Sequence, residues 1–264
     1  MIHDPYPIID SHIRFYQDNG FIKLKQVLDP DTISHYGEEI TRKVRELNTL
    51  DVPMEERNTY QKAFMQVTNL WRTSDVVSQF VHGKRLAGIA ASLMGTESVR
   101  MYHDQALYKE PSGGFTPWHA DQFYWPLASD KTVTAWIPLQ ATPLDMGPLA
   151  FSAKSHRFTY GRDLPISDES EQMIQKALKM EGFMMYEEPF ELGEVSFHSG
   201  WTFHRAGPNT TEHPRKVMTI IYMDGNMRLK EPENDNQRLD QETWCPGARV
   251  GEVIDTPLNP ILYP

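Results

Sequence analysis

The chain of 264 residues has a single cysteine, Cys245, no long apolar run and no internal repeat. One cysteine excludes a framework of disulfides within the chain and is typical of a reducing compartment. The sequence has no apolar run of the roughly twenty residues that a membrane span needs, and its polar N-terminus does not resemble a signal peptide. We therefore expect a cytoplasmic protein.

Positive charge is also scarce. Lysine and arginine number 26 against 36 aspartate and glutamate residues, which gives a formal net charge of −10. This balance argues against nucleic acid and against an anionic membrane as partners, but it is compatible with a local basic pocket for an acidic ligand. Aromatic residues are plentiful, with 12 Phe, 11 Tyr and 6 Trp, so a sizeable core is expected. We expect a small-molecule partner, and composition sets no oligomeric state.

Helical periodicity dominates the first 95 residues. Asp29 and Pro30 predict the start of a helix, which the apolar stripe from Ile33 to Leu47 continues. A second helical pattern runs over residues 74–93 and is expected to end at Gly95. Residues 21–24 are compatible with a short strand. Residues 64–71 are compatible with a strand or a loop that faces the entrance of an active site, and equally with a purely structural role.

After residue 95 the pattern changes to short β-rich runs separated by glycine and proline. The expected strands cover residues 99–108, 131–139, 194–197 and 216–222, and a helix is expected over 168–180. Such a pattern predicts a mainly β (α+β) fold, a double-stranded β-helix (jelly roll, cupin-like) with the N-terminal helices packed on one sheet. We expect a single domain over 1–264, with a helical part at about 1–95, a jelly-roll core at about 96–224 and an extended C-terminal tail at 225–264.

Three side chains form a candidate metal site. His119 and Asp121 are two positions apart, so in a strand they would project from the same face. His204 lies far downstream and would complete a set of two imidazoles and one carboxylate. That set leaves the opposite coordination positions open and is typical of non-heme Fe(II) oxygenases. A His-x-Asp pair alone is a weak motif, but Arg215 on the next expected strand adds weight to it.

The pattern His119-x-Asp121, His204 and Arg215 resembles the phytanoyl-CoA dioxygenase family of Fe(II)/2-oxoglutarate-dependent oxygenases. The similarity runs from about Phe15 to Tyr222. Further similar stretches lie at residues 134–139, 146–149, 155–156, 193–198 and 204–209. Two positions depart from the family pattern.

The first departure is Lys154, which replaces a glycine usual in the family. The second is Ala206, which stands where many members have a small hydroxyl residue near the cosubstrate. The second departure places one hydrogen bond to the cosubstrate in question and leaves the metal site intact.

The resemblance implies a role for each residue of the site. His119, Asp121 and His204 would be the catalytic ligands of Fe(II), and Arg215 would bind the far carboxylate of 2-oxoglutarate through its planar fork. Residues that would line the cosubstrate pocket are Gln105, as an amide donor, and Trp136, as a wall. The implied reaction uses dioxygen, converts 2-oxoglutarate to succinate and hydroxylates an unactivated C–H bond. Because Asp121 is present, the resemblance implies oxygen transfer and not halogenation.

Several aromatic residues are candidates for the substrate pocket. Phe123, Tyr124 and Trp125 directly follow the His-x-Asp pair, and Trp201 precedes His204. They would shape the pocket together with Tyr102 and Trp71, although each is equally compatible with a packing role. The aromatic loop and the acidic composition favour a compact, partly apolar substrate over a coenzyme A ester.

The sequence is also compatible with another third metal ligand and with other functions. His198 and His213 compete with His204 for the third ligand position, while His103 and His156 are expected to be structural. A cupin-type metal enzyme that uses no oxoacid, and a non-catalytic binding protein on the same fold, would share much of the pattern. The cupin alternative has no need of Arg215.

Overall fold

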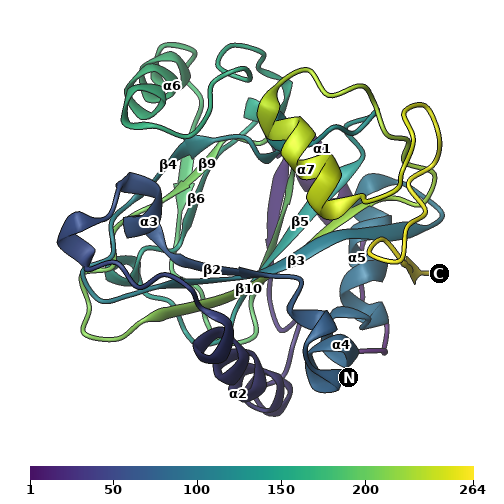
Figure 1. The fold of residues 1–264 in the computed structure, drawn as a ribbon, viewed down its shortest axis with the longest axis horizontal. Coiled ribbons are helices and arrows are strands. Elements are labelled where there is room, and N and C mark those ends of the chain that lie inside the picture. Colours follow the sequence, from purple (N-terminus) through teal and green to yellow (C-terminus); the bar gives the residue numbers. More distant parts are fainter.

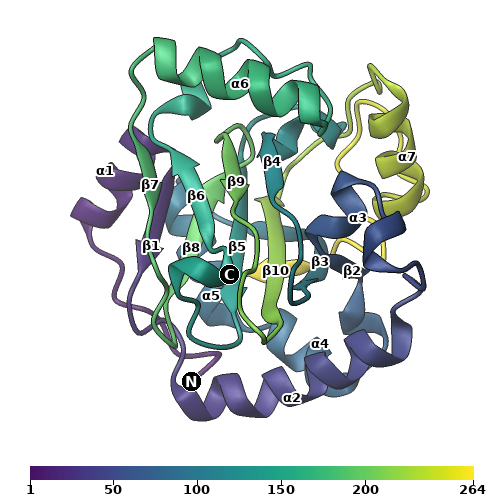
Figure 2. The same ribbon diagram turned by 90° about the vertical axis from the view of Figure 1, so that its left-hand side faces the viewer.

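A computed structural model describes residues 1–264 as two antiparallel sheets flanked by helices (Figure 1). The larger sheet has the order β1 (Phe21–Leu24), β8 (Val195–Ser199), β5 (Thr132–Pro138), β10 (Arg215–Asp224), β3 (Val99–Lys109) and β11 (Ile261–Tyr263), and β2 (Met65–Thr68) also pairs with β3. The smaller sheet has the order β4 (Thr116–His119), β9 (His204–Ala206), β6 (Leu149–Ser152) and β7 (Met185–Glu187). In Figure 2 the smaller sheet lies in front of the larger one.

Seven α-helices and five 3-10 turns accompany the sheets. The helices are α1 (Asp10–Asn19), α2 (Pro30–Leu47), α3 (Thr59–Ala63), α4 (Asp75–Val81), α5 (Lys84–Met94), α6 (Asp168–Met180) and α7 (Asp235–Trp244). The turns are η1 (Met54–Glu56), η2 (Leu70–Arg72), η3 (Asp121–Tyr124), η4 (Leu144–Met146) and η5 (Ser155–Arg157). No helix combines the length and the apolar character that crossing a bilayer would require.

Buried apolar side chains lie on both faces of the larger sheet and form two separate layers. On β5, Ala135 and Ile137 face the main core, where α2, α4 and α5 pack against the larger sheet. Trp136 lies between them in sequence and points to the opposite face, toward residues of the smaller sheet. A period of two places neighbouring side chains on opposite faces, so one strand supplies both the helix-packed core and the space between the sheets.

The expected helix signals of the N-terminal part are confirmed. Asp29 caps α2 by accepting a hydrogen bond from the backbone N–H of Thr32 at 2.6 Å, and Pro30 occupies the first turn. Gly95 ends α5 in the left-handed conformation with φ of +63°. The prediction of one continuous helix over 74–93 was wrong, because the chain breaks at His82 and Gly83 into α4 and α5.

The predicted strands and the inserted helix are also present. Residues 99–108, 131–139, 194–197 and 216–222 fall on β3, β5, β8 and β10, and α6 covers the expected residues 168–180. Residues 64–71 form β2 followed by η2, so the N-terminal part contributes β1 and β2 to the larger sheet as well as helices.

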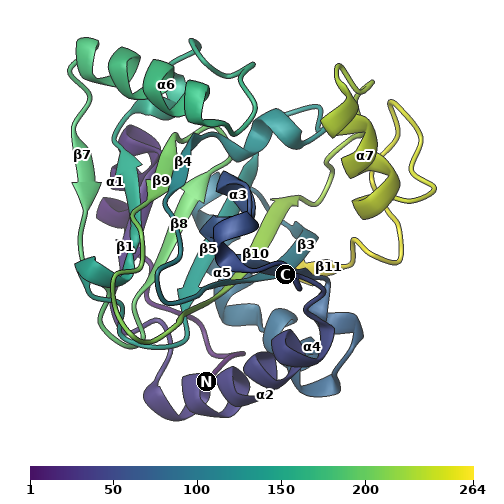
Figure 3. The same cartoon turned by 60° about the vertical axis from the view of Figure 1, so that its left-hand side comes forward.

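The C-terminal segment differs from the expected extended tail. It contains α7 and ends in β11, which pairs with β3. The helix was missed because its one buried side chain is polar, Gln237, so it shows no apolar stripe. Cys245 anchors the end of α7 in a small core that also holds Trp125 and Met227. The helix lies beside the space between the two sheets, opposite α3 (Figures 1 and 3).

Candidate active site

The three predicted metal ligands converge. His119 ends β4 and stands directly opposite His204, the first residue of β9, with 4.2 Å between the ring centroids. Asp121 begins η3 and does not belong to β4, but Ala120 before it is extended, so Asp121 still projects on the side of His119. One ligand atom from each of the three lies within 4.8 Å of the others. The arrangement can hold one metal ion.

Backbone carbonyls fix the orientation of both imidazoles. His119 Nδ1 lies 2.7 Å from the carbonyl oxygen of Pro117, and His204 Nδ1 lies 3.0 Å from that of Thr202. A carbonyl oxygen only accepts hydrogen bonds, so each Nδ1 must carry the proton and each Nε2 is left with a free lone pair. The two Nε2 atoms lie 3.5 and 3.7 Å from Asp121 Oδ1, around one common point.

The protonation states suit a divalent cation. Burial, and after it the neighbouring His119, hold the pKa of His204 well below its usual 6.5, so this imidazole is neutral. Burial alone would raise the pKa of Asp121, but the three surrounding histidines outweigh it and hold that pKa well below 3.8. Neutral imidazole and ionised carboxylate are the forms that bind metals.

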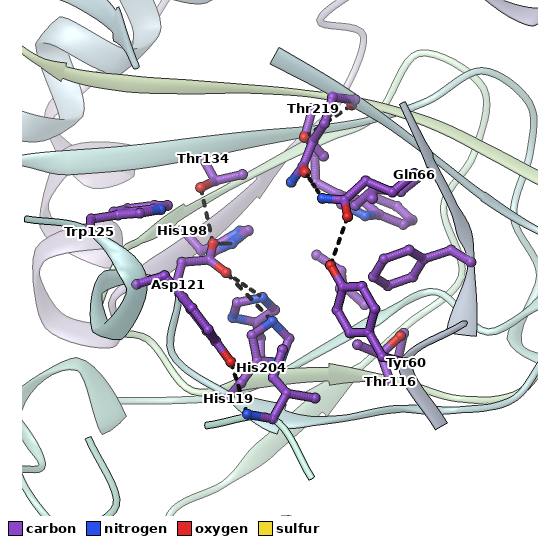
Figure 4. A pocket seen from close by; sticks show the side chains of 18 of the residues that line it. Tyr60, Gln66, Thr116, His119, Asp121, Trp125, Thr134, His198, His204 and Thr219 are labelled. Atoms are coloured by element: carbon purple, nitrogen blue, oxygen red, sulfur yellow. Dashed lines mark hydrogen bonds and ion pairs between the residues drawn. The ribbon is translucent and has the colours of Figure 1, made fainter. Parts of the chain in front are cut away.

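The second oxygen of Asp121 is held from the other side. Thr134 Oγ1 donates a hydrogen bond to Oδ2 at 3.3 Å, and His198 Nε2 lies 3.3 Å from the same atom (Figure 4). The carboxylate therefore presents Oδ1 to the ligand cluster and commits Oδ2 to protein donors. His198 is a neighbour of Asp121 and not a member of the three-residue cluster. The other competitor, His213, is exposed outside the cavity.

The cluster opens into a cavity of about 510 Å³ that lies between the sheets and reaches α7. Arg215, the first residue of β10, lines this cavity and is only 2% exposed. Its guanidinium lies 5.5 Å from the ring centroid of Trp136, and its Nη1 donates to the carbonyl of Gly147 at 2.5 Å.

Arg215 has capacity left for a ligand. Its buried Nε has no hydrogen-bond partner, and no carboxylate lies within 4 Å of the guanidinium. Burial lowers the pKa of Arg215 to about 9, which leaves it charged at neutral pH. A buried, charged and unpaired donor is costly unless a ligand satisfies it, so the residue fits an anionic group in the cavity.

Gln105 and Trp136 both line the cavity, as the resemblance implies. The Gln105 carbonyl accepts a hydrogen bond from Gln66 Nε2 at 2.5 Å, which leaves its own amide nitrogen free to donate. Trp136 stands opposite Thr219 across the β5–β10 pair. Thr116, directly opposite Ala206 on the β4–β9 pair, has a buried hydroxyl without a partner at the cavity wall.

Two of the four aromatic substrate candidates lie at the cavity. Tyr124 and Trp125 line it, whereas Phe123 and Trp201 border a neighbouring surface depression instead. Phe123 and Tyr124 are consecutive in the 3-10 turn η3, where neighbouring side chains point about a third of a turn apart, so these two rings do not share one face. Trp201 is covered by the guanidinium of Arg162, whose central carbon lies 4.4 Å from the ring centroid.

The remaining aromatic candidates serve packing. Trp71 packs against the main core and makes an edge contact with His82. Tyr102 is fully buried, and its hydroxyl reaches Asp240 on α7. Both lie outside the cavity wall.

Several residues of the cavity mouth were not predicted. They come from α3, the segment before α6 and α7: Tyr60, Ile166, Asn236, Asp240 and Trp244. Gln66 on β2 also lines the cavity and belongs to residues 64–71, for which a position at the site entrance was one of two alternatives. Tyr60 donates its hydroxyl hydrogen to Gln66 at 2.8 Å, which continues the chain of contacts to Gln105 (Figure 4). No local sequence signal marks these residues, because they meet only through long-range contacts.

Relatives in sequence are 2-oxoglutarate-dependent and other oxygenases. The chain is 24% identical to a probable alpha-ketoglutarate-dependent hypophosphite dioxygenase of Stutzerimonas stutzeri, over 79% of this chain and 76% of the relative. It is 22% identical to an ectoine dioxygenase of Streptomyces anulatus, over 86% and 82%.

Solved structures with the same fold include two that contain 2-oxoglutarate (alpha-ketoglutarate). The epimerase SnoN of nogalamycin biosynthesis, in complex with Fe³⁺, alpha-ketoglutarate and a nogalamycin, matches with a TM-score of 0.80 at 22% identity over 96% of this chain and 98% of that one. EctD from S. alaskensis with 2-oxoglutarate and 5-hydroxyectoine matches with a TM-score of 0.74 at 20% identity over 97% and 90%. The family profile described as phytanoyl-CoA dioxygenase (PhyH) covers residues 16–217, which confirms the resemblance. The chain belongs to the phytanoyl-CoA dioxygenase family.

Proposed function

We propose that this protein is an Fe(II)- and 2-oxoglutarate-dependent dioxygenase that hydroxylates a C–H bond of a small molecule. One observation carries the proposal: a cavity holds both a convergent set of two imidazoles and one carboxylate, and a buried arginine without an anionic partner. The first feature suits a ferrous ion and the second an oxoacid. Membership of the family supports both assignments.

His119, Asp121 and His204 would hold the metal through two Nε2 atoms and Oδ1. Bound there with 2-oxoglutarate, iron would supply the activation of dioxygen, coupled to decarboxylation of the oxoacid to succinate. The protein orients both imidazoles through their Nδ1 hydrogen bonds, so that each Nε2 points to the metal position. Retention of Asp121 leaves no coordination position for chloride, which favours oxygen transfer over halogenation.

Arg215 would bind the far carboxylate of 2-oxoglutarate, with Trp136 beneath the guanidinium and Gln105 as an amide donor. Ala206 lacks the hydroxyl that many family members have at this position. Thr116 is its partner across the β-pair and offers an unused buried hydroxyl to the same cavity. We infer that Thr116 supplies the missing hydrogen bond.

The two antiparallel sheets would be the halves of a double-stranded β-helix, and the chain would form one domain over 1–264. The part of the cavity that would hold the cosubstrate lies between the sheets, where its aromatic walls would exclude water. Tyr124 and Trp125 would border the substrate, since both lie at the cavity beside Asp121. Exclusion of water strengthens the charge interactions of the site and suppresses side reactions.

The substrate is proposed to be compact. The cavity of about 510 Å³ must also accommodate the metal and the oxoacid, which leaves room for a small molecule but not for a coenzyme A ester in full contact. Relatives with names that state a substrate act on hypophosphite, ectoine and 1-deoxypentalenic acid. A cupin-type enzyme without an oxoacid is disfavoured, because it would leave Arg215 buried and unpaired.

The test is anaerobic addition of Fe(II) and 2-oxoglutarate to the purified protein, followed by visible absorption spectroscopy. We expect the metal-to-ligand charge-transfer band of the chelated oxoacid, and its loss in His204→Ala. No band in the wild type would overturn the proposal. A band that persists in His204→Ala would move the third ligand to another residue. Conversion of 2-oxoglutarate to succinate under air separates an enzyme from a binding protein.

A further inference from the structure

One carboxylate at the cavity has no role in holding metal or oxoacid. Asp240 lies on α7, and Asn236, Asp240 and Trp244 follow one another at intervals of four residues. This spacing places the three on one helix face, and all three line the same cavity as the metal cluster. The helix therefore presents a polar and aromatic face to the site, which explains its lack of an apolar stripe.

Asp240 has no positively charged partner. The Tyr102 hydroxyl donates a hydrogen bond to its Oδ2 at 3.1 Å, and no lysine, arginine or histidine nitrogen comes within 4 Å of the carboxylate. Arg215 is the one arginine at the cavity wall, and no lysine lines it. A ferrous ion, ionised Asp121, doubly charged 2-oxoglutarate and Arg215 add to zero net charge. Asp240 is then left as the uncompensated charge of the loaded site.

The surroundings of Asp240 suit a cation. Tyr60, Tyr124 and Trp244 line the cavity and can offer ring faces to a positive group. The Trp244 ring is itself held by a stack with His103, with 4.4 Å between the ring centroids. The net charge of −10 also favours the approach of a cation over that of an anion.

Burial keeps Asp240 from being fully ionised while the site holds no substrate. It raises the pKa of this carboxyl to about 7, although the Tyr102 hydroxyl and the Trp244 indole act in the opposite direction. A bound cation would favour the charged form, so its attraction to the carboxylate would offset the free-energy cost of burying that charge.

We propose that Asp240 binds a positively charged nitrogen group of the substrate, such as an ammonium or amidinium, against the aromatic rings of the cavity mouth. The substrate class is thus a compact organic cation or zwitterion. The inference rests on the proposed function for the chemistry that follows binding, whereas binding itself can be measured separately.

The experiment uses matched probes of equal shape and different charge. The protein is loaded anaerobically with Fe(II) and 2-oxoglutarate and titrated with choline or its neutral isostere 3,3-dimethylbutan-1-ol, and with acetamidinium or acetamide. Binding is followed by calorimetry and by tryptophan fluorescence, since Trp244 lines the cavity. We expect at least one cation to bind about tenfold more tightly than its neutral isostere.

Two variants on the same helix localise the effect. Asp240→Asn should abolish the preference for the cation and leave the charge-transfer band of the oxoacid intact. Asp235→Asn removes the same charge from a side chain that is fully exposed, so it should keep the preference. Equal affinity for cation and isostere in both pairs, or a preference that survives Asp240→Asn, would overturn the inference.

The two proposals fail in different ways. A protein that shows the charge-transfer band without a cation preference retains the proposed function and loses the inference about Asp240. A protein with the cation preference but without the band retains the cation site and loses the proposed function.

Discussion

The inner end and the mouth of the cavity are formed mainly by different kinds of secondary structure. At the inner end, strands β4, β9 and β10 place His119, His204 and Arg215, each no more than 9% exposed. At the mouth, the wall comes from α3, the short strand β2, the segment before α6 and α7. The paired strands of the inner end fix side chains by a ladder of backbone hydrogen bonds, whereas the helices and the loop of the mouth rely more on side-chain contacts. The inner end is thus suited to holding the metal and the cosubstrate, and the mouth to determining which substrate binds.

The two ends of the cavity also differ in the sign of the charged side chain that lacks an oppositely charged partner. The inner end holds a buried guanidinium with an unused Nε, and the mouth holds a carboxylate without a cationic partner. An anionic group bound at the inner end and a cationic group bound at the mouth would together pair with both side chains. If this contrast is correct, changes at the inner end should abolish metal or cosubstrate binding, while changes at the mouth should alter substrate binding and stability only.

The largest effect is expected from the metal ligands. His119→Ala removes one of three ligand atoms, so affinity for Fe(II) should fall by more than about 100-fold, since loss of an outer-shell partner alone costs about 10–100-fold. Oxidation of 2-oxoglutarate should cease. Metal binding is measured by calorimetry with Fe(II) under anaerobic conditions. His213→Ala changes an exposed histidine outside the cavity and should leave affinity unchanged. Equal losses in both variants would contradict the assignment.

The next effect is expected at Arg215. Arg215→Ala should weaken 2-oxoglutarate binding by about 2–5 kcal/mol, because it removes one partner of a buried charge pair. Arg215→Lys retains the charge without the planar fork and should restore only part of that loss. The dissociation constant is read from titration of the charge-transfer band. Lys216→Arg changes the next residue of β10, which points to the opposite face, and serves as the control. Unchanged affinity in Arg215→Ala would show that another group holds the carboxylate.

A smaller effect is expected behind the metal, at His198. His198→Phe keeps an aromatic ring but removes the nitrogen that lies 3.3 Å from Asp121 Oδ2. Asp121 would then lose one of the two groups that orient it, and Fe(II) affinity should fall by about 10–100-fold. Thr134→Val removes the other group, and Thr134→Ser, which retains the hydroxyl, should behave like the wild type. If Thr134→Ser is as impaired as Thr134→Val, packing and not the hydrogen bond is what matters.

The inner end could be predicted from the sequence to a large extent. Strand periodicity and the spacing of His119 and Asp121 fix their common side, and the family pattern supplies His204 and Arg215. The position of Lys154 shows the limit of the pattern. Its φ of +68° is the left-handed conformation that favours glycine, which accounts for the glycine usual there, yet this chain forms the same turn with a lysine.

The mouth could not be predicted in the same way. Asp240 and Trp244 lie in a polar segment whose helix has no apolar stripe, and their place at the cavity depends on contacts with Tyr102 and His103 on β3, far away in sequence. Composition alone could not separate Tyr124, which lines the cavity, from Phe123, its neighbour in η3, which does not. Residues fixed by periodicity are predictable, whereas those fixed only by tertiary contact are not.

The smallest predicted effect concerns stability at the mouth. Asp240 loses its proton near pH 3.8 in the unfolded chain and near pH 7 in the folded one, because burial disfavours the charge. Between these values the folded state binds more protons, so the contribution of Asp240 to the free energy of unfolding falls as the pH rises through this window. Asp240→Asn keeps an acceptor for the Tyr102 hydroxyl and removes the ionisation.

We expect Asp240→Asn to raise the free energy of unfolding by about 1 kcal/mol at pH 8, a value reduced from the full shift because the side chain is partly exposed to solvent. At about pH 4 the difference should vanish, since the folded wild type is then protonated at Asp240. Urea unfolding at both pH values measures this. A variant that gains stability at pH 8 while losing cation binding would show that this carboxylate is retained for the ligand and not for the fold. Equal or lower stability at pH 8 would contradict that view.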